Sequence, residues 1–189
     1  MIVLAGGASR RFGSDKLAHD LDGATLLDRA LAGVPADLPV VVVGPTRSVV
    51  RSVTFVREDP PGGGPGAALL TGLRAALDRG AEVVVTLPGD APDAGAAVPV
   101  LLGRLGEAAA VVGVDPGGQE QPLQVALRAD AALALIGRAG PAAGAGASVR
   151  RMLADLEPRP LPVPLGAAAA FDIDTVQQAE VWRHRRPAD

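Results

Sequence analysis

The chain has 189 residues, 48% of them hydrophobic, and a formal net charge of −3. This length predicts one domain spanning residues 1–189, and the composition supplies enough apolar side chains for a core. The small negative charge argues against proteins that coat nucleic acids or membrane surfaces. Cysteine is absent and only two histidines occur, which excludes disulfides and thiolate or histidine-rich metal sites. Oxygen ligands, which suit Mg²⁺, remain.

Taken in chain order, strand and helix patterns alternate through the first half. Apolar runs predict buried strands at 2–5, 40–43, 53–56 and 82–87. Helical spacing predicts helices at 25–32, 67–77 and 97–105, with a short helix after Gly44-Pro45. Proline and glycine crowd residues 60–66, which we therefore expect to be irregular.

The second half of the chain reads less regularly. Strands are predicted at 110–114 and 123–127, and an edge strand at 161–163, where prolines flank or interrupt the run. Helices are predicted at 131–136, 148–156 and 176–184. The alternation predicts an α/β fold: a single-domain, Rossmann-like three-layer sandwich with a mostly parallel central sheet.

The first predicted strand runs into the glycine pair Gly6-Gly7 and then into a basic loop that contains Arg11 and Lys16. A glycine pair lets the backbone approach a ligand closely, and the two cations favour an anionic one. We therefore predict a phosphate-binding loop, with Lys16 exposed on it. The alternative is a glycine turn with two exposed basic residues. Neither the Walker pattern nor the dinucleotide fingerprint fits this stretch.

Two carboxylates follow predicted strands. Asp90 comes directly after the run at 82–87, at the carboxyl end of a sheet where ligands bind and where it could hold Mg²⁺ against phosphate oxygens. Its alternative role is to cap the next helix. Asp59 follows the strand at 53–56 and either contacts a ligand or opens a proline-rich turn. Gly62, Gly64 and Ala67 satisfy the loose dinucleotide pattern, although Pro65 removes a donor that such a loop would use.

Several of these residues together resemble a known signature. The matching residues are Leu4-Ala5-Gly6-Gly7, Arg11, Gly13 and Asp15-Lys16, and then Pro88, Asp90 and Pro92. This pattern resembles the MobA-like nucleotidyltransferases, the molybdenum cofactor guanylyltransferase family, whose fold is of the nucleotide-diphospho-sugar transferase type. Cytidylyltransferases of the same superfamily tend to read Leu-Ala-Ala-Gly, so Gly6 favours the guanylyl type.

The resemblance implies a reaction and its participants. GMP would pass from GTP to the phosphate of molybdopterin, or of molybdenum-bound molybdopterin, and pyrophosphate would leave. Arg11, Lys16 and Asp90 would be catalytic. Leu4, Ala5, Gly6, Gly7, Lys16, Asp59 and Asp90 would contact the nucleotide. The expected cofactor is Mg²⁺, and the expected partners are GTP or another NTP and a phosphorylated pterin. Other cofactor-biosynthesis proteins stay open as partners; nucleic acid and membrane are not expected.

The sequence departs from the family pattern at several places. The signature loop lacks one of the residues often found before Asp-Lys, and Val176 replaces a Pro. Gly44 stands where the guanylyltransferases can have a nucleotide-contacting Asn. Asp172-Ile173-Asp174-Thr175 replaces the usual Asn-hydrophobic-Asn-Thr. Asp174 is then a candidate second Mg²⁺ ligand, Asp172 an alternative one, and Thr175 a candidate helix N-cap.

Three other functions stay open: a molybdopterin cytidylyltransferase or other NTP transferase, a non-catalytic nucleotide-binding domain, and an NAD-binding oxidoreductase using the glycines of residues 62–67. The chain enters a predicted strand at residue 2 without a basic segment or a long apolar stretch. We therefore expect a cytoplasmic protein.

Overall fold

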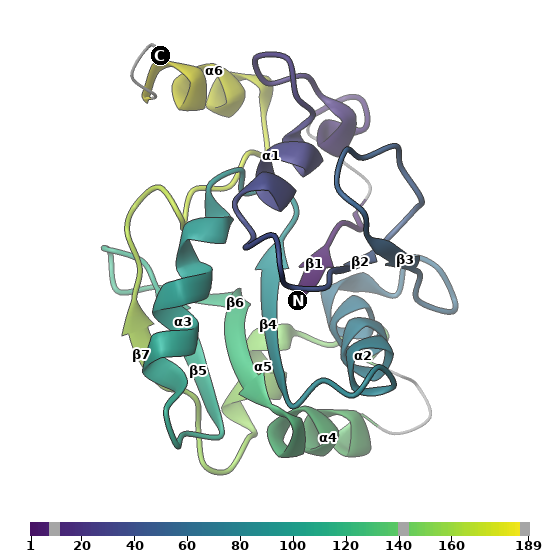
Figure 1. Ribbon diagram of the computed structural model, residues 1–189, viewed down its shortest axis with the longest axis vertical. Coiled ribbons are helices and arrows are strands. Elements are labelled where there is room, and N and C mark those ends of the chain that lie inside the picture. The colour runs from purple at the N-terminus through teal and green to yellow at the C-terminus, as the bar shows by residue number, and fades with distance from the viewer. Residues whose placement is uncertain (8–11, 140–143, 186–189) are drawn as a thin grey trace.

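The computed structural model describes residues 1–7, 12–139 and 144–185, which form an α/β fold around a seven-stranded sheet. Helices cover both faces of the sheet, which confirms the predicted three-layer sandwich (Figure 1). The assignment of all 189 residues to one domain stays a prediction. Among the described residues, no helix combines the length and the hydropathy needed to cross a membrane.

The strand order across the sheet is β3-β2-β1-β4-β6-β5-β7. The strands are β1 Ile2–Leu4, β2 Val41–Val43, β3 Thr54–Val56, β4 Val83–Pro88, β5 Ala110–Val114, β6 Glu120–Arg128 and β7 Leu161–Pro164. Strands β1 to β4 pair in parallel, and β7 pairs in parallel with β5. β6 runs antiparallel to both β4 and β5. It reverses because only a tight turn, closed by hydrogen bonds between Asp115 and Gln119, separates it from β5.

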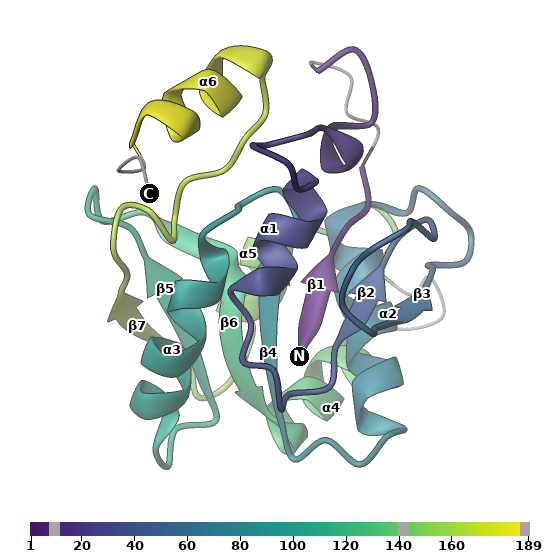
Figure 2. The same cartoon turned by 45° about the horizontal axis from the view of Figure 1, so that its top comes forward.

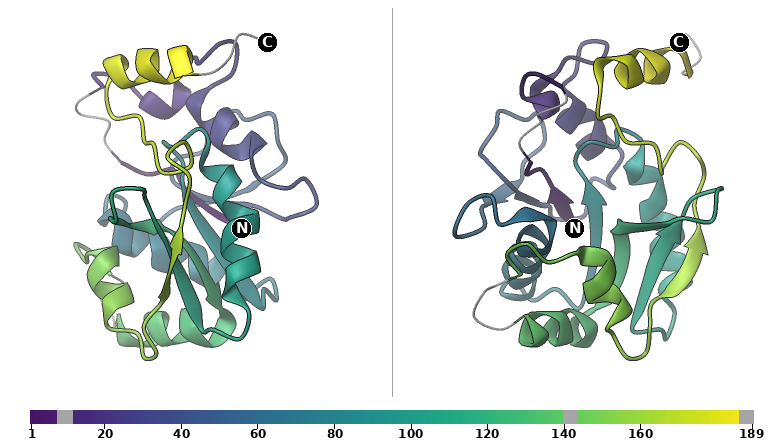
Figure 3. Two further views of the ribbon diagram at one scale, coloured as in Figure 1. Left: turned by 90° about the vertical axis from the view of Figure 1, so that its left-hand side faces the viewer. Right: turned by 180° about the vertical axis from the view of Figure 1, so that it is seen from behind.

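Each face of the sheet has its own layer of helices. The helices are α1 Leu26–Ala32, α2 Gly64–Leu77, α3 Ala97–Leu105, α4 Ala129–Arg138, α5 Val149–Ala154 and α6 Val176–Arg185, with 3₁₀ turns η1 Lys16–Ala18 and η2 Ala94–Ala96. Buried side chains of α1, α3 and α6 share one hydrophobic cluster, whereas those of α2, α4 and α5 share the other (Figure 3).

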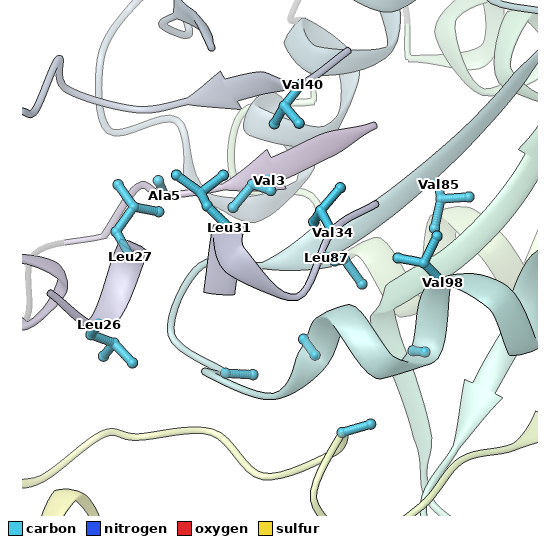
Figure 4. Close-up of a cluster of buried hydrophobic side chains, with 14 of the residues drawn as sticks. Val3, Ala5, Leu26, Leu27, Leu31, Val34, Val40, Val85, Leu87 and Val98 are labelled. Carbon is cyan, nitrogen blue, oxygen red and sulfur yellow. The ribbon is translucent and has the colours of Figure 1, made fainter. Parts of the chain in front are cut away.

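The central strands contribute to both clusters because successive side chains point to opposite faces. Val3 lies in the α1/α3 cluster, where Figure 4 shows it among Leu31, Val34 and Leu87. Its neighbours Ile2 and Leu4 lie in the α2/α4/α5 cluster. Full burial of one such aliphatic side chain contributes about 1.5–3 kcal/mol, so this short apolar strand is fixed firmly in the middle of the sheet.

Two predictions about local structure were wrong. α2 begins at Gly64, so residues 64–66 are helical rather than irregular. Pro65 lies in the first helical turn, where an N–H has no partner within the helix, and proline is therefore tolerated there. The short helix expected after Gly44-Pro45 is also absent, since residues 45–53 contain no helix. Arg51 in this segment instead donates hydrogen bonds to carbonyl groups after α1, including Val34 and Leu38.

The carboxyl ends of β1 to β4 lie at one edge of the sheet, and the C-terminal segment returns to this edge. Figures 1 and 2 show α6 beyond the strand ends and beside α1. Trp182 of α6 is 2% exposed and donates its indole N–H to Asp93 Oδ2 at 2.6 Å. Arg183 pairs with Asp22 Oδ1 at 3.2 Å. These contacts hold α6 beside the loop that follows β4 and beside the turn that precedes α1.

Candidate active site

Lys16 lies between two carboxylates at this edge. Its Nζ donates to Asp90 Oδ2 at 2.7 Å and to Asp174 Oδ1 at 2.6 Å. The Lys16 side chain is only 12% exposed, so the prediction that it lies on an exposed loop was wrong. The sequence placed Lys16 and Asp90 near the same phosphate, but no spacing rule could show that Asp174, 158 positions away, would meet the same ammonium group.

The turn that carries Lys16 is held by its neighbour Asp15. Asp15 Oδ1 accepts the backbone N–H of Leu17, which caps η1. Both Asp15 oxygens also accept the guanidinium of Arg47, from Nε at 2.8 Å and from Nη2 at 3.1 Å. Arg47 Nη1 donates further to the carbonyl of Ala5. Arg47, which the sequence analysis did not single out, therefore ties the start of the Lys16 turn to the end of β1.

The segment that carries Asp174 is fixed by backbone and side-chain hydrogen bonds. Ile173 is fully buried and donates its N–H to the carbonyl of Asp90 at 2.9 Å. Gln178 Oε1 accepts the N–H groups of Asp174 and Thr175, while Thr175 Oγ1 accepts the N–H of Gln178. This reciprocal arrangement is a capping box at the start of α6. Thr175 is therefore a helix cap, as one alternative predicted, and the cap also orients Asp174.

The end of β1 approaches the neighbouring strand ends closely. Gly7 has φ +113°, a conformation that residues with a Cβ rarely adopt. Gly44 follows β2, and a Cβ there would lie 2.5 Å from the carbonyl oxygen of Ala5. An Asn at position 44, as the family pattern allows, would therefore collide with the backbone of the predicted phosphate loop. The departure at Gly44 is thus a packing requirement of this chain.

A cavity of about 460 Å³ opens in front of these strand ends. Its walls come from the ends of β1, β2, β3 and β4, from the start of α2 and from β6. The lining residues are Leu4, Gly6, Gly7, Pro45, Arg57, Glu58, Gly62, Gly64, Pro65, Ala68, Asp90 and Leu123. This volume is in the range of small-molecule and cofactor sites.

The structure brings most, but not all, of the predicted site residues to this cavity. Leu4, Gly6, Gly7 and Asp90 line it, Lys16 contacts Asp90, and Asp174 contacts Lys16. Ala5 is fully buried beneath it. Asp59 is exposed and does not line the cavity, whereas its neighbour Glu58 does. Arg11 lies outside the described residues. Burial cannot be read from the two adjacent acidic residues, so the sequence could not choose Glu58 over Asp59.

The charges of the cluster shift two pKa values. Burial lowers the pKa of Lys16, but the Asp90 and Asp174 carboxylates outweigh it and leave the pKa above its ordinary value. Partial desolvation, followed by the Asp90 and Asp174 charges, raises the pKa of Asp172. Asp172 is nevertheless exposed and therefore stands at the rim of the cluster.

The donor set fits a divalent cation. Oxygens of Asp90 and Asp174 converge on one positively charged nitrogen, which shows that the two carboxylates can share a single cation. Within the described ranges, no group of three or more acidic or histidine side chains forms a complete metal cage. Mg²⁺ typically takes one or two carboxylates and fills its remaining positions with phosphate oxygens and water. Two carboxylates beside a phosphate loop match that requirement.

The glycine loop, the lysine and the paired carboxylates lie together in the fold, and sequence comparison identifies the family. Residues 1–159 match the family described as the MobA-like NTP transferase domain. The chain belongs to this family. Asp174 lies beyond the matched range, although it contacts Lys16 within it.

Known proteins support the same family. Over 116 residues the chain is 40% identical to a molybdenum cofactor guanylyltransferase from Acidiphilium cryptum, and the match spans 58% of each protein. The molybdopterin-guanine dinucleotide biosynthesis protein A of Archaeoglobus fulgidus has a similar structure, with a TM-score of 0.72 at 19% identity over 97% of this chain and 96% of that one. The Rv0371C protein of Mycobacterium tuberculosis, solved in complex with manganese, aligns with a TM-score of 0.65 at 16% identity over 98% and 97% of the two chains. Because these two solved structures are less than 25% identical to the chain, they show a shared fold only.

Proposed function

We propose that the protein transfers GMP from GTP to the phosphate of molybdopterin, or of molybdenum-bound molybdopterin, in a Mg²⁺-dependent reaction. The observation that carries this proposal is the Lys16 ammonium held between Asp174 and Asp90, the latter in the wall of a cavity large enough for a nucleotide. The name of the Acidiphilium cryptum relative supports the choice of GTP and of a molybdenum-cofactor acceptor. A cytoplasmic location belongs to the same proposal.

The proposed reaction needs positioning and charge neutralisation rather than a side-chain nucleophile. An oxygen of the acceptor phosphate forms a bond to the α-phosphorus of GTP. The bond from the α-phosphorus to the bridging oxygen breaks, and pyrophosphate leaves with that electron pair. Gly6 and Gly7 would present backbone N–H groups to the triphosphate. Arg11 stays a predicted second cation on this loop.

Lys16 and the two carboxylates would exchange partners during binding. In the structure, Lys16 pairs with both Asp90 and Asp174. We propose that Lys16 turns to the phosphates when GTP enters and that Asp90 and Asp174 then hold Mg²⁺. The metal would neutralise charge on the α-phosphate and on the departing pyrophosphate. The ordinary pKa of a lysine already keeps it protonated at neutral pH, as this role requires.

The test is pyrophosphate release by the purified protein with molybdopterin, Mg²⁺ and each of GTP, CTP, ATP and UTP. We expect release with GTP at a rate well above that with CTP. Faster release with CTP would contradict the guanylyl assignment but retain the transferase class. GTP binding without pyrophosphate release from any nucleotide would instead favour a non-catalytic nucleotide-binding domain.

A further inference from the structure

One buried carboxylate in the cavity wall has no role in the proposed transfer. Glu58 follows β3 and is 8% exposed. Its Oε1 accepts the N–H of Gly62 at 3.0 Å. Its Oε2 is buried, and within the described part of the chain no donor reaches it. A buried carboxylate oxygen without a donor is costly, which suggests that a bound molecule supplies the missing hydrogen bonds.

Glu58 stands at the end of the cavity away from Asp90, where the phosphates of a nucleotide are expected. The order β3-β2-β1-β4 places two strands between the one that precedes Glu58 and the one that precedes Asp90. At about 4.8 Å per strand, these two strand ends are roughly 14 Å apart. Both residues line the same cavity, and Gly6 lies between them. A nucleotide with its phosphates at Lys16 and Asp90 would therefore extend its base toward Glu58.

Glu58 also has room to meet a base. A Cβ built on Gly6 would lie 4.0 Å from Glu58 Oε1, so the glycine leaves the carboxylate uncovered on that side. Oε1 keeps an acceptor position beyond its bond to Gly62, since a carboxylate oxygen accepts two hydrogen bonds. The terminal torsion of glutamate is soft, so the carboxylate plane can turn to present both oxygens.

An ionised carboxylate accepts hydrogen bonds but donates none, and this selects among the bases. Guanine has two adjacent donors on its pairing edge, the ring N1–H and the 2-amino group. Cytosine presents one amino donor beside two acceptors, which a carboxylate would repel. We propose that Glu58 reads guanine by accepting hydrogen bonds from N1–H and the 2-amino group. This inference rests on the proposed function, because it assumes that the cavity holds a nucleoside triphosphate.

The competing explanation is that Glu58 only closes the turn at Gly62. Glu58→Gln separates the two explanations. Glutamine keeps the size of the side chain and one oxygen for Gly62, but it replaces the second acceptor with an amide donor that faces guanine unfavourably. Glu107→Gln is the matched control, since Glu107 is exposed and lies outside the cavity.

The experiment is calorimetric titration of the intact protein with Mg²⁺ and each nucleotide, without acceptor. We expect the wild type to bind GTP about 10- to 100-fold more tightly than inosine triphosphate, which lacks the 2-amino group. Glu58→Gln should lose GTP affinity by a similar factor and should bind GTP and inosine triphosphate alike. Its affinity for CTP should change less than about threefold, and Glu107→Gln should match the wild type.

Other outcomes would overturn the inference in distinct ways. If Glu58→Gln abolishes a preference for GTP over 2′-deoxy-GTP instead, the carboxylate holds the ribose. If the variant keeps the full preference for GTP over inosine triphosphate, Glu58 only closes the turn, and the proposed transfer stands. If the variant does not fold, the wild type decides: equal affinity for GTP, inosine triphosphate and 1-methyl-GTP excludes guanine reading. A wild type that releases pyrophosphate only with another nucleotide contradicts the proposed function itself.

Discussion

The first ninety residues and the C-terminal segment 160–185 contribute to the same site in different ways. The first region holds Gly6, Gly7, Lys16 and Asp90 and falls within the family match. The second lies outside that match but supplies Asp174, 2.6 Å from Lys16. The first region is tied to the sheet by buried strands. The second adds the edge strand β7 to the sheet, and its part after β7 is held by contacts such as Ile173 to Asp90 and Trp182 to Asp93.

This difference shows how a site can be recognisable in only part of its sequence. In an open α/β sheet, ligands bind at the carboxyl ends of the strands, where the sheet fixes the backbone. The small and acidic residues at these positions therefore form a pattern that can be recognised in the sequence. A docked C-terminal segment needs only one correctly placed carboxylate. If both regions are equally part of the site, variants in each should impair the same step.

Lys16→Ala should cause the largest loss. Removing one preplaced charge donor typically costs about 10²–10³ in rate, and this change also leaves two carboxylates facing each other without their cation. The measurement is kcat/KM for pyrophosphate release. Lys16→Arg keeps the charge but not its position, and should recover only part of the rate. If Lys16→Ala turned over at the wild-type rate, the assignment of a phosphate-binding loop that includes Lys16 would be wrong.

Asp174→Asn should raise the Mg²⁺ concentration needed for half-maximal transfer by at least about tenfold, and Asp90→Asn should do the same. Both lose one of the two oxygens that share a single cation. Asp172→Asn is the matched comparison, and its exposed position predicts a much smaller effect. If Asp172→Asn raised the Mg²⁺ requirement more than Asp174→Asn did, Asp172 rather than Asp174 would be the second metal ligand. If only Asp90→Asn raised the Mg²⁺ requirement, the C-terminal segment would supply no metal ligand.

Trp182→Phe should loosen the attachment of the C-terminal segment. The change keeps an aromatic ring but removes the indole N–H that donates to Asp93 at 2.6 Å. A hydrogen bond to a charged group contributes about 1.5–3 kcal/mol, so the free energy of unfolding should fall by about that amount. Urea denaturation measures this loss. The Mg²⁺ requirement should rise as well, but less than in Asp174→Asn; an unchanged requirement would mean that α6 does not position Asp174.

Asp172→Asn should modestly stabilise the metal-free protein at neutral pH. Because the pKa of Asp172 is raised by partial desolvation and by Asp90 and Asp174, its ionised form costs the folded state free energy. That cost is present above the folded pKa and disappears below the unfolded pKa of about 4. The variant should therefore have the higher melting temperature at pH 7, with the difference fading as the pH falls to about 4. The same difference at both pH values would contradict this explanation.

Much of the fold could be predicted because its strands are short apolar runs between glycine and proline turns. Val41–Val43 and Val83–Pro88 lie within one residue of their predicted bounds. The start of α2 was misplaced because proline and glycine are also compatible with a first helical turn. Among the site residues, Lys16, Asp90 and Asp174 were predicted for one site, with Asp174 as a candidate second Mg²⁺ ligand beside Asp90. The ion pairs that join them depend on the packing of α6, which sequence spacing does not encode.

The sequence did not point to the residues that hold other site residues in place. Arg47 occurs in a segment without a recognisable pattern, yet it holds Asp15 in place. Gln178 completes the capping-box pattern that begins at Thr175 and holds Asp174, but only Thr175 was predicted as a cap. Glu58 was passed over because its neighbour Asp59 fitted the family pattern, whereas only the folded chain shows which of the two side chains is buried.

The most direct test of the proposed transfer follows the fate of the α-phosphate. The intact protein is incubated with Mg²⁺, molybdopterin and GTP labelled either at the α- or at the γ-phosphate. The account predicts that the α-label appears in a pterin dinucleotide, that the γ-label appears in pyrophosphate, and that the two form in equal amounts. Recovery of the α-label as free GMP, or of the γ-label as inorganic phosphate, would contradict it.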